Sequence, residues 1–245
     1  MWCIFVRQNG KHRSKKFFKK SCEKIWNMKL SVVYLWNKTK NIMGYTTDFK
    51  GDFYLSNELS QEQFDYLVKL NETRRMKRDV NQLQTLFEGK HGYPGRTGTP
   101  EEVYGKDGEY FVGGSGHGGQ DRDDSIIDYN TPPGQVPISY GGSFIESVNE
   151  NGRRIRHGEC QPGLWCGWIV ENEIDGQVLR WDGGEKFYHY IEWLGYLIKH
   201  FFEPWGIKLD GEVYWNGEES EDMGKIVVRN NEIEVYEGSI VYEKK

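Results

Sequence analysis

The 245-residue chain has a formal net charge of −5 and is 37% hydrophobic and 15% aromatic, with nine Trp and fifteen Tyr. This aromatic content predicts a core of large rings and excludes a disordered chain, and no apolar run approaches the roughly eighteen residues that a membrane-spanning helix needs. The four cysteines form no CxxC pair, so the sequence predicts no zinc site or disulfide framework but reduced thiols in a cytosolic protein: Cys3, Cys22, Cys160 and Cys166.

The segment 1–42 is strongly basic, with eleven Lys and Arg against one acid, Glu23, whereas the remainder of the chain sums to −15. The acidic remainder repels phosphate, so nucleic acid is expected as a partner only through the basic segment. Two interpretations of this segment stay open. It is a basic arm for nucleic acid or a membrane surface, or it is an over-extended gene start, since a composition typical of a folded domain begins at Met43.

The first elements predicted after Met43 are a strand at 49–55 and a helix at 60–78. The strand is indicated by apolar residues that alternate with polar ones, and the helix by apolar residues at helical spacing. Ser60 and Gln63 form a capping box that marks the start of the helix, because each side chain can bond the backbone of the other.

Residues 79–160 differ from the rest of the chain because they are rich in Gly, Asp and Pro. Their spaced aromatic residues predict an irregular insertion that is mostly ordered and packs on the domain, since loops of this length are otherwise uncommon. Within it, residues 146–158 are expected to form an exposed hairpin tip or a flexible excursion.

The C-terminal part of the chain predicts a hairpin, one long helix and three strands. The hairpin pairs 164–170 with 177–181 across an Asp175-Gly176 turn. An apolar stripe at helical spacing follows Gly183-Gly184 and ends before Pro204. The closing strands are expected at 207–215, 224–229 and 232–237, with Asn230-Asn231 as the last turn because Asn tolerates a positive φ.

Together these elements predict an α+β fold of ferredoxin-like order, in which two helices cover one face of an antiparallel sheet. The last hairpin extends the sheet, and the long Gly-rich insertion at 79–160 interrupts a single domain over residues 43–245. The open sheet edge after the final strand favours a homodimer.

Four stretches of the chain are distinctive: ETRRMKR (72–78), DYNTPPGQ (128–135), QPGLWCGW (161–168) and WDGGEKFYHYIEWLGYLI (181–198). Together they resemble a family of uncharacterised proteins encoded in tailed phages and prophages, over most of the chain after Met43. The resemblance implies a start equivalent to Met43 and an extra segment at 136–160, where the family's second and third stretches nearly abut. The C-terminal half is also similar in outline to ferredoxin-like domains of other mobile-element proteins. The resemblance implies a phage accessory protein and carries no known activity.

Arg74, Arg75, Lys77 and Arg78 are predicted at the C-terminal end of the first helix, where cations complement the helix dipole. Guanidinium groups also bind phosphate in a bidentate manner, so the cluster is a candidate clamp for a phosphate or a nucleotide. A solvated helix end is the alternative. Adjacent residues of a helix point about 100° apart, so only one of Arg74 and Arg75 shares a face with Arg78.

Trp165, Trp168 and Trp181 lie on the two strands of the predicted hairpin. Most tryptophans belong to a core, but the odd separation of Trp165 and Trp168 predicts that they lie on opposite faces of a strand. One of them is therefore a candidate stacking platform for a ligand on the open face of the sheet.

Asp182, Glu185 and Lys186 lie where the second hairpin strand is expected to meet the long helix. Asp182 is expected to cap that helix, and the amides of Gly183 and Gly184 offer an alternative anion nest. These three residues complete the candidate ligand-binding set.

No metal or other cofactor is expected. An acidic run near His117 offers oxygen ligands but lacks the EF-hand spacing, and such runs are usually solvated: Asp121, Asp123, Asp124 and Asp128. No nucleophile elbow, Walker motif or histidine pair indicates an enzyme.

The function expected from these features is that of an accessory host-takeover or anti-defence protein in the cytoplasm of an infected bacterium. It would act without catalysis, by binding a host protein or a nucleotide-like ligand. The alternative is an enzyme that acts on a nucleotide or phosphate ester, with Arg74 and Arg75 as clamps and Asp182 or Glu185 as acid or base.

Overall fold

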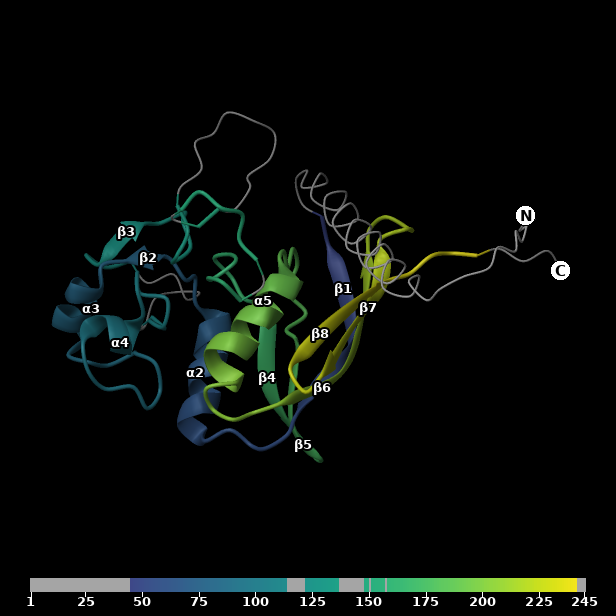
Figure 1. The fold of residues 1–245 in the computed structure, drawn as a ribbon, viewed down its shortest axis with the longest axis horizontal. Coiled ribbons are helices and arrows are strands. Elements are labelled where there is room, and N and C mark those ends of the chain that lie inside the picture. Colours follow the sequence, from purple (N-terminus) through teal and green to yellow (C-terminus); the bar gives the residue numbers. More distant parts are fainter. Residues whose placement is uncertain (1–44, 114–121, 137–147, 150, 157, 242–245) are drawn as a thin grey trace, which may run out of the picture. The chain divides into compact units, whose positions relative to one another are not determined.

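A six-stranded antiparallel sheet lies at the centre of the structure, a computed structural model that describes residues 45–113, 122–136, 148–149, 151–156 and 158–241 (Figure 1). The strand order is β4-β5-β1-β6-β7-β8, and every neighbouring pair is antiparallel. The α+β class and the antiparallel sheet are therefore confirmed. The basic segment 1–42, with both of its interpretations, lies outside the described residues. The strands are β1 (Thr47–Leu55), β4 (Trp168–Glu173), β5 (Gly176–Trp181), β6 (Leu209–Gly217), β7 (Met223–Arg229) and β8 (Glu232–Glu237).

The two faces of the sheet differ in burial. Along the central strands β1 and β6, Phe53, Leu209 and Val213 are fully buried, whereas the alternate residues point to the other side and are exposed, as Tyr54, Asp210 and Glu212 are. Helices α2 (Gln61–Glu72) and α5 (Tyr190–Leu197) pack on the buried side (Figure 1). We call this side the helix-covered face and the opposite side the open face.

Helix α2 begins as predicted and ends earlier than predicted. The capping box is confirmed, because the Gln63 backbone N–H donates to the Ser60 hydroxyl and the Ser60 N–H donates to the Gln63 side chain. The helix ends at Glu72, and Thr73 is extended with φ −108° and ψ 131°. The prediction that the helix reaches Arg78 was wrong. The residues after Thr73 contact residues that are far away in the sequence. Helical periodicity in the local sequence does not reveal such contacts.

Replacing Ser60 by alanine is expected to lower the free energy of unfolding by about 1 kcal/mol, because one N-terminal amide of α2 loses its acceptor. Chemical denaturation of wild type and variant measures the difference. Ser60→Asp is the matched control, since an aspartate accepts the same hydrogen bond and should keep most of the stability. Equal losses in both variants would contradict the capping role.

Helix α5 begins later than predicted. The chain from Asp182 to His189 is not helical, and both Lys186 (φ 63°) and His189 (φ 57°) have left-handed backbones. From Tyr190 the helix runs into a π-helical turn, η3 (Ile198–Phe202), which ends before Pro204 as expected. In the part of the chain that the structure describes, no helix is long and apolar enough to cross a membrane.

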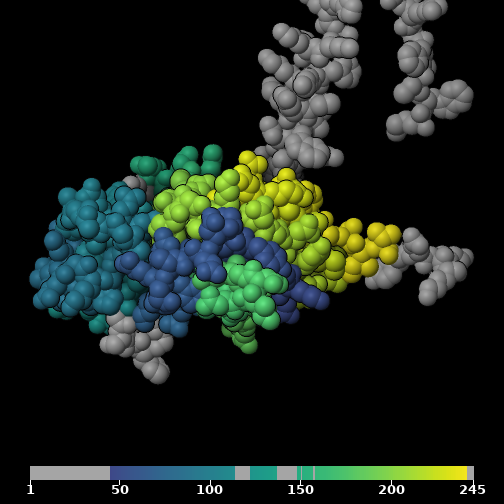
Figure 2. All heavy atoms as spheres, turned by 90° about the horizontal axis from the view of Figure 1, so that it is seen from below, coloured from purple at the N-terminus to yellow at the C-terminus, as the bar shows by residue number. Residues whose placement is uncertain are grey.

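The region predicted as an irregular insertion contains regular elements that the sequence analysis missed. Helix α3 (Val80–Phe87) is capped by Asp79, and helix α4 (Pro100–Tyr104) has a capping box between Thr99 and Glu102. A short ribbon pairs β2 (Lys77–Arg78) with β3 (Ile126–Asp128). Leu83, Tyr104 and Phe111 form a small core of their own. The part of the chain around residues 80–113 gathers at one end of the space-filling view (Figure 2).

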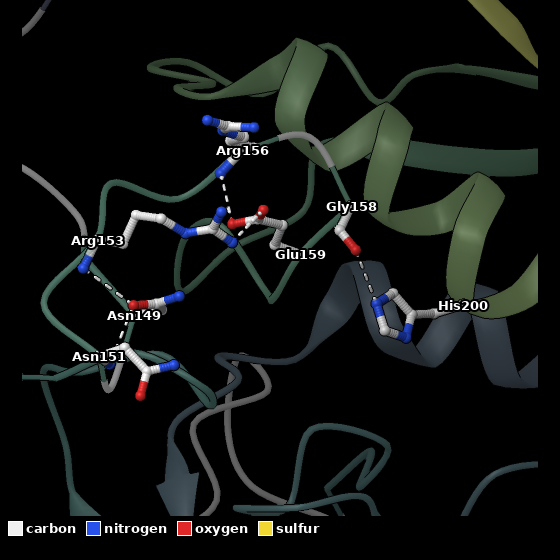
Figure 3. A network of polar contacts seen from close by, with 7 residues as sticks. All are labelled: Asn149, Asn151, Arg153, Arg156, Gly158, Glu159 and His200. Carbon is white, nitrogen blue, oxygen red and sulfur yellow. Dashed lines mark hydrogen bonds and ion pairs between the residues drawn. The ribbon is translucent and has the colours of Figure 1, made fainter.

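The segment predicted as an exposed tip at 146–158 is anchored where the structure describes it. Val148 bridges Arg154, and Ile155 is buried to 7% exposure. The Asn149 side chain accepts the backbone N–H groups of Asn151 and Arg153, and Arg153 forms an ion pair with Glu159 at 2.6 Å (Figure 3).

The predicted hairpin and closing strands are present with shifted ends. β5, β7 and β8 match the expected positions. In the turn between β7 and β8, Asn230 and Asn231 both have a positive φ, at 52° and 73°. β4 starts only at Trp168, so the chain from Leu164 to Gly167 is outside the strand. This shift changes the placement of the predicted tryptophan site.

Candidate functional site

The three arginines predicted as an anion clamp bind different partners instead of one shared site. Arg74 stacks on the Tyr129 ring at 4.4 Å and donates to Asn130. Arg78 is buried and forms an ion pair with Asp123 at 2.5 Å. Because these residues lie on an extended chain and not on a helix, the helical argument about their faces was wrong.

Arg75 is the member of the cluster that lies deepest, at 2% exposure. Its Nε donates to the Gln161 side chain at 2.8 Å and its Nη1 to the Phe111 carbonyl at 2.7 Å. The Gln161 amide returns a hydrogen bond to the Arg75 carbonyl, so the pair joins the end of α2 to the segment before β4.

The tryptophans do not form a platform on the open face. Trp168 and Trp181 are opposite each other in the β4–β5 register and both point to the helix-covered face, where each packs on Phe49 at about 5.5 Å between ring centroids. Trp168 is 1% exposed and donates its Nε1 to the Tyr190 carbonyl. Trp165 is 40% exposed but precedes the strand. The prediction that Trp165 and Trp168 alternate on one strand was therefore wrong.

Asp182, Glu185 and Lys186 are exposed in the turn after β5. Asp182 does not cap α5: it accepts the Gly184 N–H at 2.8 Å and the Asn71 amide at 2.8 Å, and the helix starts only at Tyr190. No hydrogen bond or ion pair within the described residues joins these three side chains to Arg74 or Arg75. The acid–base arrangement predicted for an enzyme is therefore not assembled here.

The open face carries three exposed tyrosines that the sequence analysis did not select. Tyr54, Tyr214 and Tyr236 are 58%, 52% and 46% exposed. Tyr214 and Tyr236 belong to one row across the sheet, because the register pairs Lys50 with Tyr214 and Lys225 with both tyrosines. The Lys225 ammonium lies 5.9 Å from the Tyr214 ring and 5.5 Å from the Tyr236 ring. The alternation along β6 could have placed Tyr214 outside, but only the register reveals the row.

Charged side chains surround these tyrosines. Arg180 bonds both carboxylate oxygens of Asp52, at 2.8 and 3.0 Å, and forms ion pairs with Glu171 and Glu173. A hydrogen bond from Lys225 lowers the pKa of Glu212. Eight carboxylates and four basic groups give the strand residues of this face a net charge of −4: Asp48, Asp52, Glu171, Glu173, Asp210, Glu212, Glu232 and Glu234 against Lys50, Arg180, Lys225 and Arg229.

A buried polar network lies on the other side of the sheet, around η3. His200 Nε2 donates to the Gly158 carbonyl at 3.2 Å, since a carbonyl only accepts (Figure 3). Its Nδ1 therefore accepts the Tyr110 hydroxyl at 3.4 Å. Burial lowers the pKa of His200 to about 4, and burial raises the pKa of Glu109, which the charge of Arg75 opposes. Perturbed groups of this kind often gather at functional sites.

The structure gives no metal-binding arrangement within the described residues, where no group of three His, Cys, Asp or Glu side chains converges. His117 and Asp121 of the acidic run lie outside those residues. Asp123 pairs with Arg78, and Asp128 accepts hydrogen bonds from Asn130 and Thr131. Cys166 is buried, and burial raises the pKa of its thiol to about 12, so it packs as an apolar group.

Comparisons of this chain with protein-family models, with curated proteins and with solved structures give no match.

Proposed function

We propose that this chain is a phage-encoded accessory protein that acts without catalysis in the cytoplasm of an infected bacterium, by binding a host protein. The open face is the binding surface, and a cationic segment of the host protein is the ligand. The four distinctive stretches of the sequence support the phage origin.

The observation that carries this proposal is the exposure of Tyr54, Tyr214 and Tyr236 on a face of net charge −4. Exposed large rings mark interaction sites, and tyrosine supplies much of the binding energy at protein interfaces. The surplus of carboxylates favours a cationic partner and disfavours nucleic acid, because charge complementarity selects partners and raises association rates.

We also propose that the fold is ferredoxin-like. The order β6-β1-β5-β4 within the sheet supports this, with α2 between β1 and β4 and α5 between β5 and β6 in the chain. β7 and β8 then extend the sheet beyond β6, and the elements between α2 and β4 are an insertion. In this arrangement the two helices share one face, which leaves the other face for a partner.

Site-specific crosslinking in a bacterial host tests the function. A photo-crosslinking residue replaces Tyr214 in one variant and Tyr188 in another, because Tyr188 is 37% exposed but lies outside the sheet. We expect a host protein to be crosslinked at position 214 and not at 188, through a segment rich in Lys and Arg. Crosslinks at both positions, or an acidic contact segment, would contradict the proposal.

Alanine variants of the exposed tyrosines test how much each ring contributes to the binding free energy. Tyr54→Ala and Tyr214→Ala are each expected to weaken binding of the crosslinked host protein by about tenfold, since a hot-spot side chain is worth about 1–2 kcal/mol. Tyr188→Ala is the matched control and should leave the affinity unchanged. Calorimetric titration measures all three variants, and unfolding curves show whether each remains folded.

A further inference from the structure

Strand β8 (Glu232–Glu237) is an edge of the six-stranded sheet. It pairs with β7 on one side, and in the part of the chain that the structure describes no strand pairs with its other side. Proline residues and bulges protect many sheet edges, and β8 contains neither. The unpaired backbone groups of such an edge are a template for a further strand.

The backbone of β8 points every second residue away from β7. In an antiparallel ladder, a residue that bonds one neighbouring strand alternates with a residue that faces the opposite way. The Gly238 N–H donates to the Met223 carbonyl at 2.7 Å, so the even-numbered residues of β8 face β7. The N–H and C=O groups of Ile233, Val235 and Glu237 therefore point outward at the edge.

Two rows of side chains cross the open face and end on β8. The strand register defines a basic row and an acidic row: Lys50, Tyr214, Lys225 and Tyr236, and Asp52, Glu212, Val227 and Glu234. The basic row ends at Tyr236 and the acidic row at Glu234. The two rows attract each other within one protomer, since Lys225 bonds Glu212 at 3.0 Å. Arg229 bonds Glu234 at 2.6 Å and offsets part of the acidic charge.

The charges of these rows select one register for a second copy of β8. An antiparallel second copy keeps both open faces on the same side, so even-numbered residues lie opposite even-numbered ones. If the two-fold axis passes through Glu234, the two acidic rows meet, and if it passes through Tyr236, the two basic rows meet. With the axis at Val235, Tyr236 lies opposite Glu234 of the partner subunit. Each basic row then continues into an acidic row, which is the favourable arrangement because like charges opposite each other destabilise a sheet.

The register with Val235 on the axis also uses the outward backbone groups. Val235 lies opposite its own copy, and Ile233 lies opposite Glu237 of the partner subunit. Each of these pairs exchanges two hydrogen bonds, which gives about six bonds across the edge. Val235 and Tyr236 are 43% and 46% exposed in the single chain, so pairing also removes apolar surface from water.

We propose that two copies of this chain associate through β8, antiparallel about a two-fold axis at Val235. The two sheets join into one continuous sheet of twelve strands, and both open faces lie on the same side of it. The association uses the edge of the sheet, so it stands independently of the proposed function. Where the open face binds a host protein, the dimer presents that face twice.

Sedimentation equilibrium of the full chain measures the mass in solution and tests the dimer. We expect a rise with concentration from 28.7 kDa toward twice that mass. Val235→Pro should abolish this rise and keep the fold, because the Val235 N–H points outward and proline is tolerated at such edge positions. Circular dichroism checks that the variant is folded.

Asn172→Pro is the matched control, because it places the same change on the opposite edge strand, β4. The Asp182 N–H donates to the Gly167 carbonyl, so the odd-numbered residues of β4 face β5 and the Asn172 amide points outward. Asn172→Pro should keep the dimer, and so should Tyr54→Ala, which tests the open face. The proposal is overturned if the full chain stays a monomer at every concentration, or if Asn172→Pro abolishes the dimer and Val235→Pro does not.

Cysteine variants test the register without a proline. Oxidation of Val235→Cys should give a disulfide-linked dimer, because the two Cα atoms at the axis are about 5.5 Å apart. Glu234→Cys should crosslink no more than wild type, which controls for the native cysteines. In this register Glu234 lies diagonal to its own copy, at about 7–8 Å, beyond the reach of a disulfide. Crosslinking at position 234 equal to or above that at 235 would overturn the proposed register.

Discussion

Replacing Phe201 by alanine is expected to lower the free energy of unfolding by about 4 kcal/mol. Phe201 is fully buried in η3, and five aromatic rings lie within 6.3 Å of its ring centroid: Tyr66, Tyr93, Tyr110, Tyr196 and Trp205. Truncation of a buried phenylalanine removes its transfer free energy and leaves a cavity, at a typical cost of about 3–5 kcal/mol. Urea denaturation followed by tryptophan fluorescence measures the loss.

Phe201→Ala should also make local unfolding of the insertion between α2 and β4 more frequent. Tyr93 and Tyr110 belong to the region between α2 and β4, and Phe201 joins both to the main core. We expect faster hydrogen exchange at their amides, which bond the carbonyls of Val103 and Tyr104. Phe201→Leu keeps most of the volume and serves as the control. If Phe201→Ala lowers the free energy of unfolding by less than about 1 kcal/mol, far below the typical cost, the Phe201 ring does not hold the insertion to the main core.

Short-range signals in the sequence predicted the sheet well. Alternation located β1 and β5, the Asn230-Asn231 pair located the last turn, and Ser60 with Gln63 located the start of α2. Each of these signals acts within a few residues, where local chemistry decides the backbone. The capping box at Thr99 and Glu102, with Pro100 between them, was equally visible and would have located α4.

The errors arose where distant contacts override local preference. The helix expected to reach Arg78 stops at Glu72, because Arg75 is drawn into bonds with Gln161 and Phe111, 86 and 36 residues away in the chain. Patterns among neighbouring residues carry no information about contacts at those sequence separations. β4 likewise starts only at Trp168, so Trp165 is not part of the strand.

The candidate sites depend on the same long-range information. The sequence identified Arg75 as a candidate anion ligand, but its hydrogen-bond partners Gln161 and Phe111 reach it only in the folded chain. On the open face, the row that contains Tyr214 depends on the pairing of four strands. Sequence patterns reveal residue types suited to binding, and the topology decides which of them meet.

A fall of pH from about 7 to 4 is expected to remove about 3 kcal/mol of stability through His200 alone. Burial lowers the pKa of His200 to about 4 in the folded protein, against an ordinary value of 6.5. The unfolded chain therefore takes up a proton first as the pH falls, and the folded state loses stability between these two pKa values. Each unit between them corresponds to about 1.4 kcal/mol.

The geometry gives the cause of this loss. The Nε2–H of His200 donates to the Gly158 carbonyl, and Nδ1 accepts from Tyr110, so the imidazole is neutral with both nitrogens occupied. Protonation adds a proton at Nδ1, where the Tyr110 hydroxyl must turn away, and the neighbouring Lys199 charge disfavours the cation. Burial raises the pKa of Glu109, and this has the opposite effect on stability. As the pH falls, protonation of Glu109 stabilises the folded state and offsets part of the loss caused by His200.

Urea denaturation at pH 7, 5.5 and 4.5 measures the pH dependence in wild type and in His200→Gln. Gln retains a side-chain donor for Gly158 but does not titrate, so the stability of this variant should fall less steeply over this range. His189→Asn is the control, because His189 lies at the start of α5 outside this network and Asn tolerates its left-handed backbone. Parallel pH profiles for wild type and His200→Gln would show that the buried imidazole does not govern the acid sensitivity of the fold.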